Sequence, residues 1–247
     1  MPDVFLSPSS QEFNPYINGG NEEYYMNIIA DAMIPYLEAS GISYGRNTTS
    51  GSFIDSVRAS NANDYKLHLA IHSNASAPQN AGKAQGTQVY YYPQSENSKH
   101  AADIFANNFK EIYPVPSKVN TVPTTVLSEV VKTKAPAILI EVAYHDNEQD
   151  AQWIRDNINS IAENLVISIG DFLGKEIKMP DTAKKGRVNT NGTNLNLRAQ
   201  PTVNSAVIGK IPDNTVIPLF ESANGWYLTE YKQTGGYVSG KYILPEK

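Results

Sequence analysis

Short apolar runs alternate with longer stretches of helical periodicity along the first 173 residues. Buried strands are predicted at the apolar runs over residues 4–6, 42–44, 67–72, 87–92 and 135–142. Apolar side chains at helical spacing predict helices over about residues 22–40, 53–61, 98–112 and 148–173. Parallel strands need crossover connections of about this length. The pattern therefore predicts an α/β domain with a mostly parallel sheet that helices cover on both faces.

Proline and glycine refine this pattern in three places. Pro35 should kink or shorten the last turns of the first helix, because proline has no backbone N–H, and Gly41 should stop the helix. Residues 113–125 are rich in Pro and Thr and are expected to form a loop. Residues 174–186 show no periodicity and are predicted to be a linker.

The pattern changes character in the last quarter of the chain. From residue 187 to residue 247, short β-like runs are broken by Gly, Asn and Pro. Five such runs in this stretch are typical of a small all-β barrel. The chain is therefore expected to hold two domains, an α/β domain over residues 1–173 and a barrel over residues 187–247.

Composition narrows the kinds of site and partner. The chain has 247 residues, a net charge of −5 and no cysteine, so disulfides, thiolate metal sites and cysteine nucleophiles are excluded. Residues 1–173 carry 10 basic and 19 acidic side chains, whereas residues 174–247 carry 10 basic and 6 acidic ones. The positive surplus of residues 174–247 is mild, and the chain has no run of basic residues with aromatic residues between them. These two features argue against a nucleic-acid partner. No apolar run reaches the roughly 18 residues that cross a membrane, so no membrane partner is expected.

Candidate chemistry is sought at the carboxyl ends of the strands, where ligands bind in parallel α/β sheets. Polar residues follow three of the apolar runs, at residues 7–14, 72–74 and 141–147. Glu22 and Glu23 are expected at this same edge of the sheet, which we call the rim, because their helix begins just after the loop that follows the first strand. His72 is a credible metal ligand, since it ends a strand and imidazole commonly binds zinc.

Glu141 ends an otherwise apolar strand. Partial burial should raise its pKa or demand a partner, which suits a general base. His68 shares a strand face with His72 but lies about 13 Å away at ~3.3 Å per residue, so the two cannot bind one metal ion without a bulge. His145 follows Glu141 by four residues and is expected to contact substrate, as is Asn74 at the same rim.

Five motifs stand in order along residues 3–173: VFLSPSS, NEEYYMN, HLAIHSNAS, GTQVYYYP and APAILIEVAYHDN. They resemble the successive motifs of zinc-dependent N-acetylmuramoyl-L-alanine amidases of the type-three class. The resemblance implies a hydrolase that holds one Zn²⁺ ion and cuts the bond between the muramic acid lactyl group and L-alanine in peptidoglycan. Matched position by position, it implies that Glu23 and His72 are zinc ligands and that Glu141 is the catalytic glutamate.

One motif departs from the family's pattern. The family's first strand ends in a Pro-Gly-His motif whose His completes the zinc site, whereas here Pro8 is followed by two serines and Gln11. A catalytic zinc normally has three protein ligands and a water. Gln11 is the best candidate for the third ligand, and His145 or Glu12 could replace it if the loop folds inward.

The tail carries a second resemblance. The runs NLNLRAQP, NGWY and GYVSGKY along residues 187–245 resemble the bacterial SH3-like (SH3b) barrel. Such barrels commonly recognise peptidoglycan cross-bridges or stem peptides, so the resemblance implies a wall-binding domain. Aromatic side chains that could line a peptide groove are Trp226, Tyr227, Tyr231, Tyr237 and Tyr242. Trp226 and Tyr237 could equally fill the small core.

Three functions are weighed. The leading hypothesis is a cell-wall amidase with a tethered wall-binding domain, located at the cell wall or outside the cell. The rival is a peptidoglycan-binding protein that keeps the amidase fold but has lost catalysis with its missing ligand. A zinc peptidase is disfavoured, because no HExxH motif is present. The first residues, MPDVFL, lack the features of a signal peptide, which fits a phage endolysin as well as an autolysin.

Overall fold

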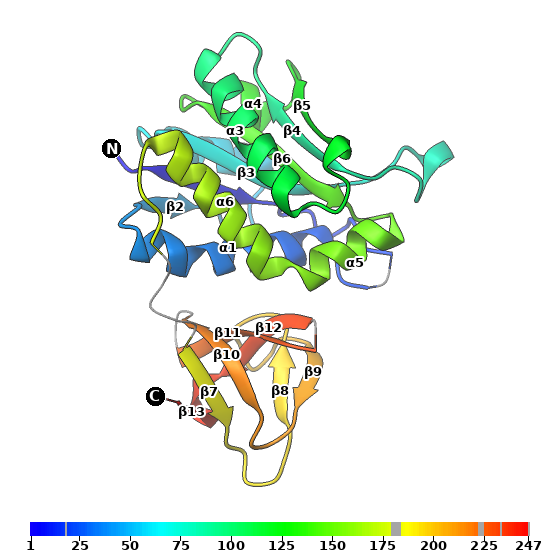
Figure 1. Ribbon diagram of the computed structural model, residues 1–247, viewed down its shortest axis with the longest axis vertical. Helices are drawn as coiled ribbons and strands as arrows, with labels where there is room; N and C mark the ends of the chain where they lie inside the picture. Colours follow the sequence, from blue (N-terminus) through cyan, green and yellow to red (C-terminus); the bar gives the residue numbers. More distant parts are fainter. Residues whose placement is uncertain (18, 179–183, 222–224, 233, 247) are drawn as a thin grey trace. The chain divides into compact units, whose positions relative to one another are not determined.

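The computed structural model describes residues 1–17, 19–178, 184–221, 225–232 and 234–246 (Figure 1). The chain divides into two compact units, Met1–Lys178 and Met179–Lys247. Within the described residues, no helix has both the length and the hydrophobicity that crossing a bilayer requires.

The first unit is built on a six-stranded sheet. Its strands are β1 (Val4–Pro8), β2 (Tyr44–Arg46), β3 (Leu67–Asn74), β4 (Thr87–Tyr91), β5 (Val119–Pro123) and β6 (Ala137–Tyr144), in the spatial order β2-β1-β3-β6-β4-β5. Neighbouring strands are parallel, except that β4 runs antiparallel to β6. The predicted mostly parallel sheet is confirmed.

Helices cover both faces of this sheet (Figure 1). Their bounds are α1 (Glu22–Ala39), α2 (Phe53–Asn61), α3 (Glu96–Ile112), α4 (Ser128–Val131), α5 (Glu148–Asp156) and α6 (Ile158–Leu173), with short 3₁₀ turns at Pro78–Asn80 and Pro116–Lys118. Helices α1, α3 and α6 pack together on one face, while α2 and α4 pack against each other on the opposite face. The α/β class that the sequence predicts is confirmed.

Strand β3 shows how the period of two sorts side chains between the two helical layers. Leu67, Leu69 and Ile71 are fully buried, and their strand lies against α1. His68 alternates with them, and its ring contacts Ser60 of α2 and Glu129 of α4. The polar positions of β3 therefore face the layer formed by α2 and α4.

Helix α1 continues through Pro35, contrary to the prediction that Pro35 could shorten its last turns. It runs to Ala39, and the N–H of Ser40 donates to the carbonyl of Tyr36. Proline removes its own hydrogen bond to the preceding turn, and its ring crowds the carbonyl four residues before it. Met33 and Leu37 on either side are fully buried, so the packing of this stretch outweighs that loss.

Two further predictions were wrong in detail. The predicted loop over residues 113–125 contains β5, which pairs with β4 as an edge strand and ends at Pro123, a position that an edge strand tolerates. The single helix predicted over residues 148–173 is divided at Asn157, whose side chain donates to the carbonyl of Trp153. An asparagine that bonds to a nearby carbonyl competes with the helix, and this local bond coincides with the break.

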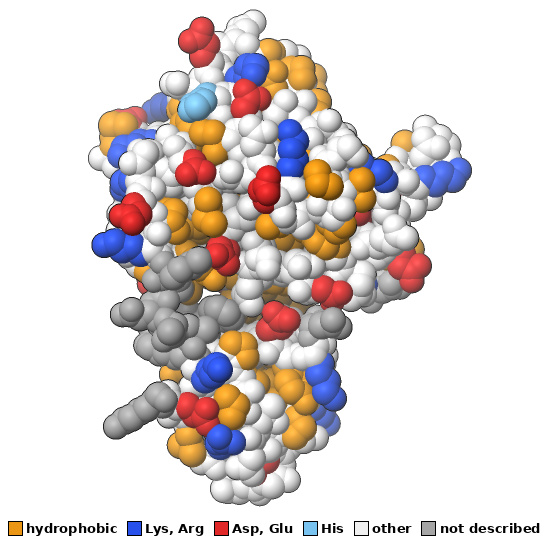
Figure 2. Space-filling view, viewed as in Figure 1, with side chains coloured by type: hydrophobic (Ala, Val, Ile, Leu, Met, Phe, Trp, Pro, Cys, Tyr) orange, Lys and Arg blue, Asp and Glu red, His pale blue; other side chains and the backbone are white. Residues whose placement is uncertain are grey.

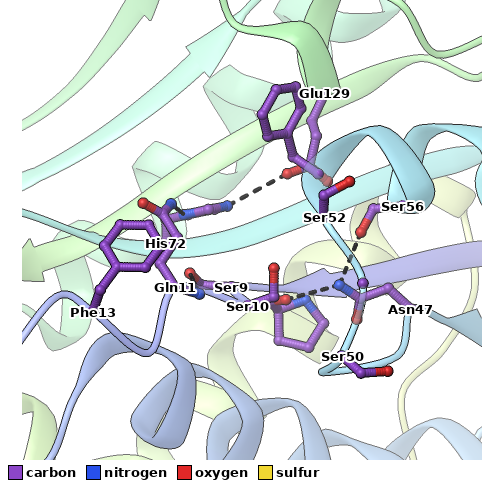
Figure 3. A pocket seen from close by; sticks show the side chains of 13 residues that line it. Ser9, Ser10, Gln11, Phe13, Asn47, Ser50, Ser52, Ser56, His72 and Glu129 are labelled. Carbon is purple, nitrogen blue, oxygen red and sulfur yellow. Dashed lines mark hydrogen bonds and ion pairs between the residues drawn. The ribbon is translucent and has the colours of Figure 1, made fainter.

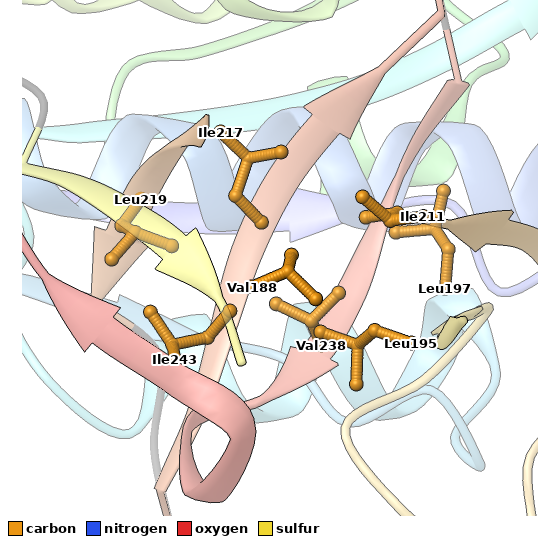
Figure 4. Close-up of a cluster of buried hydrophobic side chains, with 8 residues drawn as sticks. All are labelled: Val188, Leu195, Leu197, Ile211, Ile217, Leu219, Val238 and Ile243. Carbon is orange, nitrogen blue, oxygen red and sulfur yellow. The ribbon is translucent and has the colours of Figure 1, made fainter. Parts of the chain in front are cut away.

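The second unit is an antiparallel all-β domain. Its strands are β7 (Lys184–Val188), β8 (Leu195–Arg198), β9 (Val207–Ile211), β10 (Val216–Glu221), β11 (Trp226–Tyr231), β12 (Thr234–Ser239) and β13 (Ile243–Pro245), with a 3₁₀ turn at Gly240–Tyr242. Figure 4 shows its core, which consists of Val188, Leu195, Leu197, Ile211, Ile217, Leu219, Val238 and Ile243. The predicted small all-β domain is confirmed.

The segment predicted as a linker, residues 174–186, has three parts. Lys175 packs with the first unit, where its Nζ lies 2.8 Å from Asp3 Oδ2. Residues 184–186 already belong to β7. The middle of the predicted linker, residues 179–183, lies outside the described residues.

Candidate functional site

A cleft lies at the carboxyl ends of β1, β3 and β6, where the sequence places its candidate chemistry. Two cavities, of about 620 and 290 Å³, adjoin there and share Gln11, Phe53, His72 and Glu129 as lining residues. We call them the serine-rich arm and the apolar arm of the cleft. The serine-rich arm is lined further by Ser9, Ser10, Ser50, Ser52, Ser56 and Asn47, and the apolar arm by Val126, Leu127, Leu139 and Glu141.

Helix α1 delivers a carboxylate to His72. Asn21 caps the helix by accepting from the N–H of Tyr24, which places Glu22 at the first helical position, at the end of β1. Glu22 is 1 % exposed, and its Oε1 lies 2.8 Å from His72 Nδ1. Burial alone would raise the pKa of Glu22, but the hydrogen bond and charge of His72 outweigh it and lower the pKa.

The structure brings Glu22, and not the predicted Glu23, to His72. Consecutive residues of an α-helix point about 100° apart, so only one of the two can face the cleft. Glu23 is partly exposed, and burial together with the charge of Glu12 raises its pKa. Matching the motif by position does not show which way each side chain points, so it assigned Glu23 and not Glu22.

Gln11 reaches the same side of His72. Its Nε2 lies 3.4 Å from His72 Nδ1, and its Oε1 accepts from Asn14 Nδ2 at 3.0 Å. Asn14 Nδ2 also lies 2.6 Å from Glu22 Oε2, so the loop after β1 and the start of α1 are tied together. Figure 3 shows Gln11 directly beside His72. Glu12, weighed as a substitute ligand, is exposed.

Glu129 lies on the opposite side of the imidazole, and sequence reasoning missed it. Its Oε2 lies 3.5 Å from His72 Nε2 (Figure 3), and its Oε1 lies 3.2 Å from His68 Nε2. Interactions with the two histidines outweigh the effect of burial and lower its pKa to about 2. One signal was available, because Glu129 is the lone charge in the stretch VLSEVV, where every other residue except Ser128 is apolar.

His72 is therefore held between two carboxylates, one at each ring nitrogen. Burial by itself would lower the pKa of His72, but interactions with the carboxylates of Glu129 and Glu22 raise it well above the usual range. The hydrogen bond with Glu22 orients the ring at Nδ1, whereas Nε2 has no hydrogen-bond partner among the described residues and lies within ion-pair distance of Glu129. In the absence of other ligands, this arrangement favours the imidazolium form.

Glu141 stands next to His72 in the sheet. The two residues are register partners in the parallel pair β3–β6. Glu141 Oε2 is buried and has no hydrogen-bond partner among the described residues. Burial raises the pKa of Glu141 to about 7, against the lowering effect of the His72 charge. A carboxyl group with this pKa, lining a cavity, is suited to take up and release a proton near neutral pH.

The two predicted substrate contacts, His145 and Asn74, do not line either arm of the cleft. His145 is buried, its Nδ1 lies 2.8 Å from the carbonyl oxygen of Ser73, and its ring stacks on Tyr16. Asn74 Nδ2 donates to Gln88 at 3.0 Å. Both side chains hold the loops around the end of β3 in place.

The donors at His72 can be compared with what zinc requires. Among the described residues, no group of three or more His, Cys, Asp or Glu side chains is arranged to hold a metal ion. Glu22 and His72 supply a carboxylate and an imidazole within 2.8 Å of each other, which are two of zinc's usual ligands. The amide of Gln11 lies beside them with its Nε2 toward His72, and its ligating atom would be Oε1, which accepts from Asn14. This set fits a zinc ion with two strong ligands and one weak one.

Comparisons with known proteins follow the division into two units. Residues 11–171 match the family model described as N-acetylmuramoyl-L-alanine amidase, and residues 193–243 match that of the bacterial SH3 domain. A search of curated protein sequences found no match.

Solved structures of bacterial amidases share the fold of the first unit. The N-acetylmuramoyl-L-alanine amidase from Clostridium difficile 630 is similar with a TM-score of 0.62 and 18 % identity, over 70 % of this chain and 97 % of that chain. The N-acetylmuramoyl-L-alanine amidase AmiC2 of Nostoc punctiforme is similar with a TM-score of 0.60 and 18 % identity, over 70 % of this chain and 97 % of that chain. The catalytic domain of CwlV from Bacillus (Paenibacillus) polymyxa is similar with a TM-score of 0.60 and 17 % identity, over 71 % of this chain and 100 % of that chain. At these identities the likeness concerns the fold.

Proposed function

Since this chain belongs to the N-acetylmuramoyl-L-alanine amidase family, whose model matches well over half of it, we propose that it is a peptidoglycan hydrolase. The bond cleaved is the amide between N-acetylmuramic acid and L-alanine. The observation that carries the proposal is the half-buried Glu141, whose Oε2 atom is buried and whose pKa is raised to about 7, directly beside His72 in a cleft. A carboxyl group so placed is suited to general acid–base chemistry on an amide.

The proposal includes one Zn²⁺ ion, held by Glu22 and His72 with Gln11 as the third protein ligand. The fit rests on the adjacent carboxylate and imidazole described above. When bound, zinc would polarise the scissile carbonyl and make water a better nucleophile at neutral pH. Glu129 does not belong to this ligand set, because it contacts the other nitrogen of His72 and acts by orienting the ring.

Glu141 moves the proton in this proposal. Its carboxylate takes a proton from the attacking water and delivers it to the departing nitrogen of L-alanine. The unpartnered Oε2 atom is the one available for this step, since no protein donor occupies it among the described residues. Because the pKa of the group is raised to about 7, the base form increases as the pH rises through neutrality.

The second unit is proposed to anchor the enzyme to the wall, at a location outside the cell or in the wall itself. A cavity of about 420 Å³ on this unit is lined by Arg198, Trp226, Lys241 and Tyr242, among others. Aromatic and cationic side chains together suit a peptide ligand that carries carboxylates. Figure 2 shows Lys and Arg side chains on the surface of this unit beside fewer acidic ones.

A second candidate function has one observation in its favour. The third donor at His72 is the amide of Gln11, and an amide is a weaker zinc ligand than imidazole. This favours a peptidoglycan-binding protein that keeps the amidase fold without catalysis.

Purified walls distinguish the two functions. The full chain is assayed for zinc content and for release of new L-alanine amino termini, with Glu141→Gln as the matched control. The amidase proposal expects about one zinc per chain and amine release that the control lacks. Zinc-free protein that binds walls without amine release supports the binding function, and unchanged release by the control removes Glu141 from the reaction.

A further inference from the structure

The two arms of the cleft differ in chemistry, and His72 lies where they meet. The serine-rich arm is lined by hydroxyl and amide groups together with Pro8, Phe13 and Phe53, and its ionisable side chains are His72 and Glu129 at the inner end. The apolar arm is lined by Val126, Leu127 and Leu139, and Glu141 is part of its wall. A substrate that crosses His72 therefore meets a different environment on each side.

We propose that the serine-rich arm is a saccharide subsite that binds the glycan side of the substrate, while the apolar arm receives the L-alanyl peptide. The assignment rests on the amidase function proposed above, because that function defines which two parts of the substrate flank the scissile bond. It adds an orientation and a named binding site for the sugar, centred on Phe13, Phe53 and Ser50.

The position of Glu141 sets the orientation. The departing group in the reaction is the amine of L-alanine, which must receive its proton within hydrogen-bond reach of the general acid. Glu141 lines the apolar arm and does not line the serine-rich arm. The peptide amine consequently lies on the apolar side of His72, and the lactyl group with its sugar lies on the serine-rich side.

The lining of the serine-rich arm suits an uncharged saccharide. No Lys or Arg lines it among the described residues, so the carboxylates of a stem peptide would find no cation there. The hydroxyls of Ser10 and Ser50 have no hydrogen-bond partner within the described part of the chain. A free hydroxyl both donates and accepts, as the hydroxyl and acetamido groups of an amino sugar require.

Two exposed phenylalanine rings line this arm, and Phe53 also lines the apolar arm. Phe13 is 73 % exposed and Phe53 is 50 % exposed, although both are large apolar side chains. Exposed aromatic rings at a polar cavity mark a binding site, because they lose water-exposed surface when a ligand covers them. The C–H face of a pyranose ring is the part of a sugar that such rings can cover.

Both rings are held on fixed backbone. Phe53 is the first residue of α2, whose start is closed by reciprocal hydrogen bonds between Ser52 and Asp55. Phe13 lies in the loop that Asn14 ties to Gln11 and Glu22. Figure 3 shows Phe13 near Gln11 on one side of the pocket and Asn47, Ser50 and Ser56 on the other. The arm is thus preformed, which lowers the entropic cost of binding.

Binding of a peptide-free probe tests the subsite without relying on activity. The disaccharide N-acetylglucosaminyl-N-acetylmuramic acid, with its lactyl carboxyl group capped as a methylamide so that it is uncharged as in the substrate, is titrated into the full chain carrying Glu141→Gln, and its affinity is measured by calorimetry. Adding Phe13→Ala should weaken binding by about tenfold, because ring contact is lost. The matched control is Val126→Ala, which removes an exposed apolar side chain from the other arm and should change the affinity by less than about twofold.

Several results would overturn the inference. They are the absence of disaccharide binding, binding that Phe13→Ala leaves unchanged, or equal losses in Phe13→Ala and Val126→Ala. Circular dichroism of both variants excludes misfolding, which is not expected because both side chains are exposed. Binding that persists unchanged in Phe13→Ala would be assigned to the second unit.

A hydrolysis assay separates this inference from the amidase proposal. The chain without Glu141→Gln is compared on the disaccharide-peptide and on a lactyl-peptide that lacks the sugar. We expect a higher kcat/KM for the sugar-bearing substrate, and Phe13→Ala should reduce that preference. If neither substrate is cut but the disaccharide binds through Phe13, the amidase proposal fails and the saccharide subsite stands. If both are cut equally well, the subsite fails and the amidase proposal stands.

Discussion

Glu129 Oε2 lies 3.5 Å from His72 Nε2, on the side of the imidazole opposite Glu22. The same carboxylate contacts His68, four residues earlier on β3, so a single acidic residue links both buried histidines of this strand. A buried charge of this kind is tolerated only when partners surround it. The arrangement fixes the ring of His72 before any ligand arrives.

The first prediction concerns this carboxylate. Glu129→Gln keeps the shape of the side chain but removes the charge shared by His68 and His72, so the first unit should lose about 1–3 kcal/mol of unfolding free energy. Urea denaturation at neutral pH measures the loss. The control is Glu111→Gln, an exposed position at which a change within about 0.5 kcal/mol is expected. Equal stability of the two variants would contradict the linking role of Glu129.

A second prediction uses neighbouring residues as a matched pair. Glu22→Gln should lower the affinity for zinc by at least about tenfold, because it removes the carboxylate beside His72. Glu23→Gln should leave the affinity almost unchanged, because that side chain is partly exposed and does not face His72. Competition with a zinc-binding dye gives both affinities. A larger effect at Glu23 would restore the assignment implied by the motif alone.

The third prediction addresses the weak ligand. Gln11→His places an imidazole where the structure has an amide 3.4 Å from His72 Nδ1. We expect zinc to bind at least about tenfold more tightly, because imidazole is among the usual zinc ligands and an amide is not. The same dye competition measures it, and Gln11→Ala serves as the opposite control. Weaker binding in Gln11→His than in the unmodified chain would show that this position does not face the metal.

A fourth prediction concerns stability against acid. Asp3 is buried, and burial would raise its pKa, but hydrogen bonds from Lys175 and Lys66 outweigh this and lower the pKa well below the usual range. A lowered folded-state pKa contributes stability above the unfolded value of about 3.9, and the contribution is lost as the pH falls below it. Asp3→Asn should therefore destabilise the first unit by about 1–3 kcal/mol at neutral pH.

The difference between Asp3→Asn and the unmodified chain should shrink as the pH falls from about 4 toward the lowered folded-state pKa of Asp3, because Asp3 then becomes protonated in the unfolded chain while the folded chain still holds its charge. Thermal unfolding at several pH values measures it. Asp64→Asn, at an exposed position, is the control that should show no such pH dependence. A stability gap that stays constant down to low pH would mean that the ion pairs at Asp3 do not stabilise the fold.

Much of the fold could be predicted from the sequence, because it depends on periodicity. The alternation of apolar runs and helical stretches was sufficient to predict the mostly parallel sheet, its helical layers and the separate β domain. The hydrophobic pattern failed to predict a strand that depends on pairing with a neighbour. Residues 119–123 form a strand because β4 lies beside them, and not because of their composition.

The sequence by itself placed His72, Gln11 and Glu141 at one edge of the sheet, since strand ends and loop starts can be located from local pattern. Only the tertiary structure decided that Glu22 and not Glu23 faces His72, because that choice depends on the rotation of α1 about its axis as it packs on the sheet. Only the tertiary structure brought Glu129 to the same imidazole, because α4 and β3 are separated by more than fifty residues. Local pattern fixes where a side chain stands along its element, and packing fixes what it meets.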